Sequence, residues 1–177
     1  MKFRTSILFV FLAACGFAQG QVKQLAPYVA SPQDIIDRML EISKLQRGET
    51  VYDIGCGDGR IVITAVQKFG AKGVGIEISP KLAQSANEIV SKLGLRNRVQ
   101  ILKADAMDVD LSPADVVTLY LTTSANETLR PKLEQTLRVG ARVVSHDYPV
   151  RGWKPTAVEE VFAHNRMHKI FLYVKEK

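Results

Sequence analysis

The stretch from residue 51 to residue 63 constrains the fold more than any other part of the chain. It reads VYDIGCGDGRIVI, with a short apolar run, three alternating glycines and a second apolar run. A buried strand that ends at glycines and turns directly into a helix lets a ligand approach bare backbone and face the positive end of the helix dipole. The stretch therefore predicts one strand and one helix of an α/β sheet, joined by a loop that binds a nucleotide-type ligand.

The remaining residues alternate between strand-like and helix-like patterns. Ser31, Pro32 and Asp34 are typical of a helix N-terminus, with Ser31 as the cap and Asp34 completing a capping box. The last two predicted strands are joined by a tight turn, which indicates an antiparallel hairpin. The predicted fold is α/β: a seven-stranded, mostly parallel twisted sheet with helices on both faces and a C-terminal antiparallel hairpin. We expect helices at 32–45, 59–69, 80–93 and 124–137, and strands at 51–54, 73–76, 99–102, 115–120, 141–145, 158–163 and 168–174.

Residues 1–18 have the pattern of a targeting segment rather than of a folded element. Lys2 and Arg4 precede an apolar run that small residues follow, as in a secretory signal peptide. Residues 12–15 read LAAC and also fit a lipoprotein leader. We therefore expect an exported protein, periplasmic or held at a membrane through this leader, with residues 19–30 as a tether. If the leader is misassigned, the expected location is the cytoplasm.

Length and charge limit what the rest of the chain can be. The 177 residues are 46% hydrophobic and 24% charged, which suits one catalytic domain at 31–177 and leaves no room for a second. The net charge is +6, but the basic residues are scattered and form no run. We therefore expect no nucleic-acid partner, and we expect a monomer.

Ligands of parallel sheets bind beyond the carboxyl ends of the strands, so the residues that follow each strand are the candidate site. Glu77 stands about 20 residues after the glycine loop, where a carboxylate can accept hydrogen bonds from both hydroxyls of a ribose. The loop and the glutamate in this order predict a ribose-containing cofactor. The candidate residues in chain order are Asp53, Gly55, Cys56, Gly57, Gly59, Glu77, Asp105, Ala106, Tyr120, His146 and Asp147.

The details of the loop distinguish between cofactors. A dinucleotide-binding fold uses Gly-x-Gly-x-x-Gly, but here Arg60 stands at the position of the third glycine, and the Gly-Lys-Ser/Thr of a phosphate-binding loop is absent too. Asp53 and Asp58 would repel a pyrophosphate but suit a ligand that carries an amine and a sulfonium. S-adenosylmethionine is such a ligand. We expect no metal centre, since the histidines have no second cysteine to join them in a zinc pattern.

Five stretches extend the pattern to a family. They are PYVASP at 27–32, VYDIGCGDGRIVITA at 51–65, VVTLYL at 116–121, NETLRPKL at 126–133, and RVVSHDY at 142–148 with GWKP at 152–155. With them the chain resembles the class I methyltransferases, and among these the small protein-lysine methyltransferases of the archaeal broad-specificity type and of the mitochondrial type that acts on the ATP synthase c-subunit. The resemblance implies a Rossmann-like methyltransferase fold, S-adenosylmethionine as cofactor and a protein substrate that bears a lysine.

The resemblance also implies roles for individual residues. The loop at 55–59 would hold the methionine part of the cofactor, and Asp53 would bind its amine directly or through water. Glu77 would bind the ribose, and residues 105–106 the adenine edge. Tyr28 would close over the cofactor or over the incoming lysine.

Methylation of a lysine needs an uncharged amine beside the methyl donor. Tyr120 and Trp153 are the candidates for an aromatic slot that desolvates the amine, and His146 or Asp147 for orienting it or relaying its proton. Many amino-methyltransferases carry Asn/Asp-Pro-Pro-Tyr/Phe at this point, whereas residues 118–121 read TLYL, so only the aromatic residue matches. Two alternatives stay open: methylation of a small molecule, and a cofactor-binding module without catalytic activity.

Overall fold

The computed structural model describes residues 28–176, so the predicted leader and nearly all of the predicted tether lie outside the described residues. Helices and strands alternate along the described part. In this part of the chain, no helix is long and apolar enough to cross a lipid bilayer. The elements in chain order are α1 (Gln33–Ile42), β1 (Thr50–Ile54), α2 (Arg60–Phe69), β2 (Lys72–Glu77), α3 (Pro80–Lys92), β3 (Val99–Lys103), β4 (Val116–Leu119), α4 (Thr123–Thr136), β5 (Arg142–His146), β6 (Ala157–Ala163) and β7 (Arg166–Val174).

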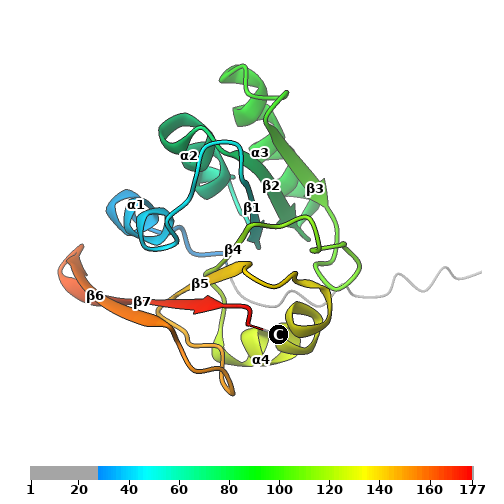
Figure 1. Ribbon diagram of the computed structural model, residues 1–177. Coiled ribbons are helices and arrows are strands. Elements are labelled where there is room, and N and C mark those ends of the chain that lie inside the picture. The colour runs from blue at the N-terminus through cyan, green and yellow to red at the C-terminus, as the bar shows by residue number, and fades with distance from the viewer. Residues whose placement is uncertain (1–27, 177) are drawn as a thin grey trace, which may run out of the picture.

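The strands form one seven-stranded sheet in the order β3-β2-β1-β4-β5-β7-β6. The first five strands of this order run parallel, and β7 lies antiparallel between β5 and β6 (Figure 1). The predicted parallel sheet with a C-terminal antiparallel hairpin is confirmed. The strand order reverses between β1 and β4, and such a reversal opens a ligand crevice beyond the carboxyl ends of these two strands.

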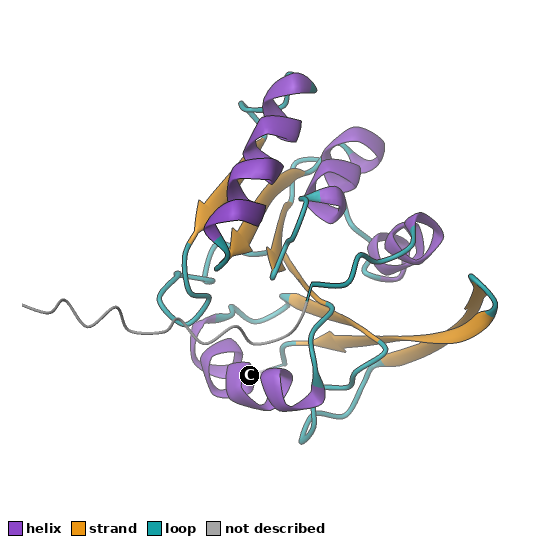
Figure 2. Cartoon of the chain, turned by 180° about the vertical axis from the view of Figure 1, so that it is seen from behind, coloured by secondary structure: helices purple, strands orange, loops and turns teal. Residues whose placement is uncertain are grey.

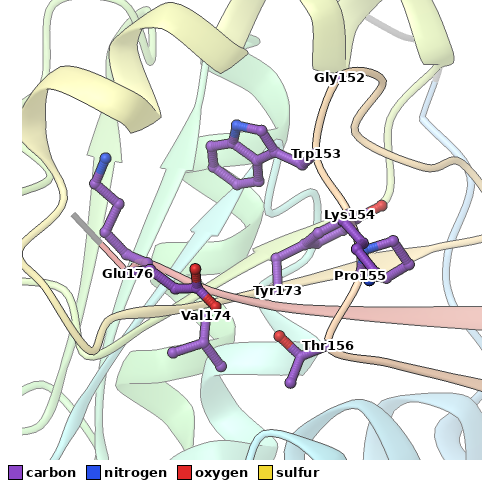
Figure 3. Close-up of a pocket in the computed structure, with 9 residues that line it drawn as sticks. Gly152, Trp153, Lys154, Pro155, Thr156, Tyr173, Val174 and Glu176 are labelled. Carbon is purple, nitrogen blue, oxygen red and sulfur yellow. The ribbon is translucent and has the colours of Figure 1, made fainter.

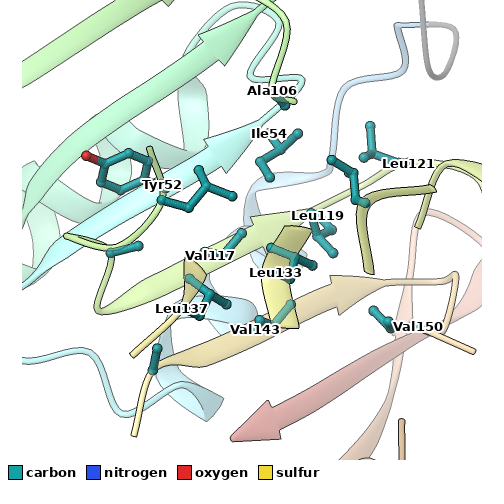
Figure 4. Packing of buried hydrophobic residues seen from close by; sticks show 14 of the residues in the cluster. Tyr52, Ile54, Ala106, Val117, Leu119, Leu121, Leu133, Leu137, Val143 and Val150 are labelled. Carbon is teal, nitrogen blue, oxygen red and sulfur yellow. The ribbon is translucent and has the colours of Figure 1, made fainter. Parts of the chain in front are cut away.

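Helices cover both faces of the sheet, as predicted, but unequally. Figure 1 shows α1, α2 and α3 on one side of the sheet and α4 on the other, and Figure 2 shows the same layers from behind. Side chains alternate along β1, so that Val51 packs with α1 and α2 while Tyr52 and Ile54 belong to the α4 side. The segment between β3 and β4 completes the α4 side through Leu111 and through Ala106, which Figure 4 shows among the residues of this core. Because both faces are buried, the register of the central strands is strongly specified.

The N-terminus of α1 differs from the prediction. Ser31 does not cap the helix, because Pro32 occupies the cap position and no side chain caps it. The Ser31 hydroxyl instead lies 3.1 Å from Nδ1 of His146. Asp34 accepts a hydrogen bond from the backbone N–H of Ile35 and completes no capping box. The Ser31 hydroxyl therefore contacts a residue far along the chain instead of capping α1, as the sequence pattern predicts it would.

Candidate functional site

The glycine loop joins β1 to α2 at the carboxyl ends of β1 and β4. Gly55, Gly57 and Gly59 have φ angles of 74°, 56° and 81°. Residues with a β-carbon rarely adopt such angles, so the alternating glycines permit this path of the backbone. Helix α2 begins at Arg60, directly after the loop, and the N–H of Arg60 donates to Oδ1 of Asp58 at 3.2 Å. The loop therefore provides the bare backbone surface that the sequence predicts.

Glu77 links the end of β2 to the glycine loop. Its side chain is buried; Oε2 accepts a hydrogen bond from the N–H of Gly57 at 2.9 Å, and Oε1 accepts one from the N–H of Ser79 at 2.8 Å. Each carboxylate oxygen can accept a second hydrogen bond, so hydroxyl groups of a ligand can bind here as well. The structure thus brings the loop and Glu77 together as predicted, while the contact with a ribose stays a prediction.

Asp53 is a buried carboxyl group at the centre of the sheet. It is 3% exposed, and its Oδ1 accepts a hydrogen bond from the Thr118 hydroxyl at 2.7 Å. Burial raises the pKa of Asp53 to about 7, the Thr118 hydrogen bond opposes this rise, and the charges of Glu77 and Asp58 add to it. A cationic ligand beside Asp53 would favour the ionised form, so the site is electrostatically suited to an amine.

Asp58 is not free to face a cationic ligand as the sequence suggests. Its carboxylate forms an ion pair with Arg60, whose Nη2 lies 2.6 Å from Oδ2. Burial would raise the pKa of Asp58, but the hydrogen bonds from Arg60 hold it below its usual value. Arg60 also donates from Nη1 to the backbone carbonyl of Ser31 at 3.1 Å. Arg60 therefore fastens the segment before α1 to the glycine loop.

Tyr28 lies on the loop. A β-carbon placed on Gly57 would come within 2.1 Å of the Tyr28 ring, so only glycine leaves room for it. The cavity that remains among Tyr28, Asp53, Gly55 and Tyr120 has a volume of about 20 Å³. A space of this size holds about one water molecule, so a cofactor can lie against the loop at this point only if the Tyr28 ring moves.

Three further predicted residues lie around the same crevice. The Cys56 thiol is buried against Gly75 in the core on the α2 and α3 side, and burial raises its pKa far above the usual value, so the thiol stays protonated. Asp105 follows β3 and accepts a hydrogen bond from the N–H of Met107 at 2.9 Å. The Ala106 side chain is buried in the α4-side core. The roles predicted for these residues in cofactor binding stay predictions.

Tyr120 and His146 meet where β4 and β5 end. Their rings are stacked, with centroids 3.9 Å apart and an interplanar angle of 26°. Tyr148 lies beside them, with its ring centroid 6.4 Å from that of Tyr120. Tyr120 also lines the small cavity at the glycine loop. An aromatic corner therefore borders the candidate cofactor site, and the predicted role of Tyr120 in an amine slot stays a prediction.

His146 is fully buried, so in this conformation it acts on a ligand only through its neighbours. Besides Ser31, it contacts His168, with Nε2 of His146 lying 2.8 Å from Nδ1 of His168. Burial lowers the pKa of His146 to about 4, despite the opposing charge of Asp147. The imidazole is therefore neutral at pH 7, and its ring packs against the ring of Tyr120.

Asp147 is the more accessible member of the predicted pair. It has a φ of 60°, and its Oδ1 accepts a hydrogen bond from the N–H of Lys169 at 3.0 Å. Its Oδ2 accepts one from Arg166 at 2.6 Å. Burial disfavours its ionisation, but the bonds from Arg166 and Lys169 hold the pKa below the usual value. Asp147 is therefore a carboxylate at neutral pH, held in place by β7.

Trp153 lies elsewhere, so its predicted place in the aromatic slot is wrong. Its indole N–H donates to Oε1 of Glu134 at 2.8 Å, and its ring meets the edge of Tyr173 at 5.6 Å. Tyr173 pairs with Val143 at the amino end of β5, whereas the candidate site lies at the carboxyl end. The cavity beside Trp153, of about 490 Å³, is a separate feature of that opposite edge (Figure 3).

Four residues of this region were missed by the sequence reasoning. Thr118 and Ser31 are short polar residues that resemble ordinary strand and cap positions. Arg166 and His168 lie on β7, which pairs antiparallel with β5, and only that pairing brings them to the strand-end corner. Only residues that follow the carboxyl ends of the strands were considered from the sequence. Because β7 is antiparallel to β5, its residues near the candidate site lie at its amino end instead.

Comparisons with known proteins agree with this geometry. Residues 53–157 match the family described as the ANTKMT methyltransferase domain. The chain is 46% identical to a protein-lysine N-methyltransferase of Saccharolobus islandicus, over 84% of this chain and 92% of that protein. It is 32% identical to the adenine nucleotide translocase lysine N-methyltransferase of Mus musculus, over 85% of this chain but only 66% of the mouse protein.

A solved structure is also similar. It is described as an RNA methyltransferase from Salinibacter ruber in complex with S-adenosyl-L-homocysteine, with a TM-score of 0.78 and 38% sequence identity. The match covers 84% of this chain and 95% of that chain. The resemblance inferred from the sequence is thereby confirmed over nearly all of the described residues. This chain belongs to the family of the ANTKMT methyltransferase domain and has the fold of the methyltransferases that use S-adenosylmethionine.

Proposed function

We propose that this protein transfers a methyl group from S-adenosylmethionine to the side-chain amine of a lysine in a protein. The observation that carries the proposal is the 46% identity to a protein-lysine N-methyltransferase over 84% of this chain. The Tyr120 ring beside the glycine loop supports it, since it supplies an aromatic wall for an amine next to a cofactor site, and the buried His146 stacks behind it.

The residues of the crevice fit this cofactor. The glycine loop leaves space that a β-carbon would fill, Glu77 offers carboxylate oxygens to hydroxyl groups, and Asp53 offers a buried carboxyl group to an amine. When bound, S-adenosylmethionine supplies a methyl group on a positively charged sulfur. The loop, Asp53 and Glu77 would orient the cofactor, and Tyr28 would close over it after moving aside to admit it. Because methyl transfer is an in-line displacement, such alignment is the main contribution of the protein.

The acceptor amine has to lose a proton first. With a reference pKa of about 10.4, keeping a lysine neutral at pH 7 costs roughly 4.6 kcal/mol, and desolvation lowers that cost. Tyr120 and Tyr148 would enclose the amine, and the Asp147 carboxylate would accept its hydrogen bond or its proton. His146 would keep the Tyr120 ring in place from below.

The experiment uses the purified full chain with S-adenosylmethionine labelled in the methyl group. Three acceptors are offered: total cell protein, the same protein with its lysines acetylated, and a protein-free metabolite extract. We expect label in the untreated protein, recovered as methyl-lysine after hydrolysis, and none after acetylation. Glu77→Gln should reduce cofactor binding and transfer together.

Other outcomes separate the alternatives. Label in the metabolite extract alone would identify a small-molecule methyltransferase. A further arm offers total RNA, because the Salinibacter ruber protein is described as an RNA methyltransferase, and label there alone would also contradict the proposal. No transfer to any acceptor, with cofactor binding intact, would leave a non-catalytic binding module.

We also propose that the protein works as an exported monomer, at a membrane if the leader at residues 1–18 is retained or acylated. The basic and apolar start of the sequence supports this proposal. Mass spectrometry of the protein isolated from cell fractions would show whether the leader is cleaved, acylated or intact. A chain that keeps an unmodified leader and is found only in the cytoplasm would overturn the proposed location, and light scattering would test the monomer.

A further inference from the structure

Three side chains converge at the corner between β5 and β7. The atoms are Nε2 of His146, Oδ2 of Asp147 and Nδ1 of His168. The two nitrogens are 2.8 Å apart, and the Asp147 oxygen lies 3.3 Å from the first and 3.4 Å from the second. Two imidazoles and one carboxylate thus bring three donor atoms within 3.4 Å of one another.

Two of the three distances fit the coordination shell of a small divalent ion. Zinc binds histidine nitrogen and carboxylate oxygen at about 2.0–2.2 Å, so two donor atoms of one zinc ion lie roughly 3.0–3.5 Å apart. The two distances to the Asp147 oxygen, 3.3 and 3.4 Å, lie in this range, whereas the two nitrogens are hydrogen-bonded at 2.8 Å and would have to separate slightly. The donor set of two imidazoles and one carboxylate suits zinc and its transition-metal neighbours rather than calcium or magnesium, which prefer oxygen. A modest rotation of the two rings, which lie at 38° to one another, would turn both nitrogens toward the ion.

The neighbours of the three side chains also resemble those of a metal centre. Metal-binding histidines usually pair their second ring nitrogen with a polar group, and Nδ1 of His146 has the Ser31 hydroxyl at 3.1 Å. The second oxygen of Asp147 accepts the N–H of Lys169. His168 is 2% exposed, and its Nε2 has no hydrogen-bond partner among residues 28–176, so the local hydrogen bonds do not fully satisfy this ring.

Arg166 competes for the same carboxylate. Its guanidinium donates to Oδ2 of Asp147 at 2.6 Å, but its side chain is 51% exposed and can turn into solvent. Without an ion, this ion pair and the hydrogen bond between the two histidines hold the corner together. With an ion, the proton shared by the two rings would move to Nε2 of His168, and Arg166 would release the carboxylate oxygen.

We propose that His146, Asp147 and His168 bind one divalent transition-metal ion of the zinc type. The ion joins the end of β5 to β7 directly beneath the ring of Tyr120, and thereby fixes the aromatic corner. The inference departs from the expectation that the chain has no metal centre, which considered only zinc patterns that include cysteines. It does not depend on the proposed methyl transfer.

The test uses the full chain without a histidine tag, stripped of metal with EDTA and dialysed against zinc chloride. We expect about one zinc ion per chain, a higher melting temperature, and visible absorption bands when cobalt(II) replaces zinc. His168→Gln and Asp147→Asn should each weaken binding at least tenfold. His164→Gln is the matched control, because His164 is exposed on the hairpin turn, and it should bind as the wild type does. Arg166→Gln should bind zinc as tightly or more tightly, since it removes the competing cation.

Several results would overturn the proposal. One is a wild-type chain that retains no zinc at about 10⁻⁴ M, a concentration that would nearly saturate a site with a dissociation constant of about 10⁻⁵ M. Another is zinc binding that His168→Gln and His164→Gln weaken equally. If His168→Gln does not fold, zinc binding by Asp147→Asn and the cobalt(II) spectrum of the wild type test the proposal instead. A cobalt(II) spectrum that shows no nitrogen ligands would exclude the site.

Discussion

The Ser31 hydroxyl lies 3.1 Å from Nδ1 of His146, although the two residues are 115 positions apart in the sequence. Ser31 also accepts a hydrogen bond from Arg60 through its backbone carbonyl. One serine therefore connects the segment that carries Tyr28, the helix after the glycine loop, and the ring beneath Tyr120. The proposed cofactor side and the proposed acceptor side of the crevice are therefore connected through Ser31.

Ser31→Ala should destabilise the protein. The substitution leaves Nδ1 of the fully buried His146 without its partner, and an unsatisfied buried polar atom costs about 1–3 kcal/mol. Urea denaturation should show this loss in the free energy of unfolding. Ser85→Ala, at an exposed position of α3, is the control and should change stability by less than about 0.5 kcal/mol. Equal effects of the two substitutions would show that the Ser31 bond contributes nothing.

Gly57→Ala should impair cofactor binding more than it impairs folding. Gly57 and Gly94 both have positive φ angles, of 56° and 68°, so alanine is strained by roughly 1 kcal/mol at either position. Only at Gly57 would the new methyl group overlap the Tyr28 ring, at 2.1 Å, whereas Gly94 has no atom within 4 Å of it. Calorimetry with S-adenosylhomocysteine should show at least a tenfold loss of affinity for Gly57→Ala and none for Gly94→Ala.

Asp53 should make the stability of the cofactor-free protein depend on pH. Its pKa is about 7 in the folded state and 3.8 as the reference value, so the folded state holds the extra proton between these values. Raising the pH from 4 to 7 therefore removes stability. Asp53→Asn is neutral throughout and keeps an acceptor for Thr118. It should be more stable than the wild type by about 1–3 kcal/mol at pH 8, and by much less at pH 5. An equal difference at both values would contradict this account.

The ionisation of Asp53 should also make the affinity for the cofactor depend on pH. A cationic amine favours the ionised carboxylate, so the affinity of the wild type for S-adenosylhomocysteine should rise by up to about tenfold from pH 6 to pH 8. Asp53→Asn should bind more weakly and show little change over this range. Calorimetry at matched ionic strength measures both. A slope that persists in Asp53→Asn would assign the titration to another group.

The order of strands and helices was predictable because local patterns agree with the fold. The strands β1, which ends at Ile54, and β4 have the apolar content that a two-sided parallel sheet requires. Helix α4 was expected in nearly its observed range, and Pro131 lies inside it. The family, and with it the candidate cofactor site, followed from short motifs whose residues lie close together in the sequence.

The aromatic corner around Tyr120 and His146 was less predictable, because it is assembled from distant segments. Ser31 has the pattern of a helix cap, yet its hydroxyl binds His146 instead. Trp153 was expected at the slot on the strength of its aromatic ring alone, but the chain carries it to the opposite edge of the sheet. His168 reaches the corner only through antiparallel pairing, a tertiary contact that periodicity along the chain does not reveal.

Tyr120 and Trp153 give opposite predictions for catalysis. Tyr120→Ala removes the ring that stacks on His146 and should lower methyl transfer by roughly 100-fold, since small misplacements of a reacting group can have effects of that size. Tyr120→Phe keeps the stacked ring and loses only a hydroxyl 3.4 Å from Arg166, so transfer should stay within about tenfold of the wild type. Trp153→Phe removes the hydrogen bond to Glu134 and should cost about 1 kcal/mol of stability without changing transfer.

The three variants are compared by initial rates of methyl transfer at saturating cofactor, after calorimetry has shown that each still binds S-adenosylhomocysteine. Loss of transfer in Trp153→Phe at temperatures where it is fully folded would place the indole in the acceptor site after all. Loss in Tyr120→Phe equal to that in Tyr120→Ala would mean that the hydroxyl, rather than the ring held by His146, positions the amine.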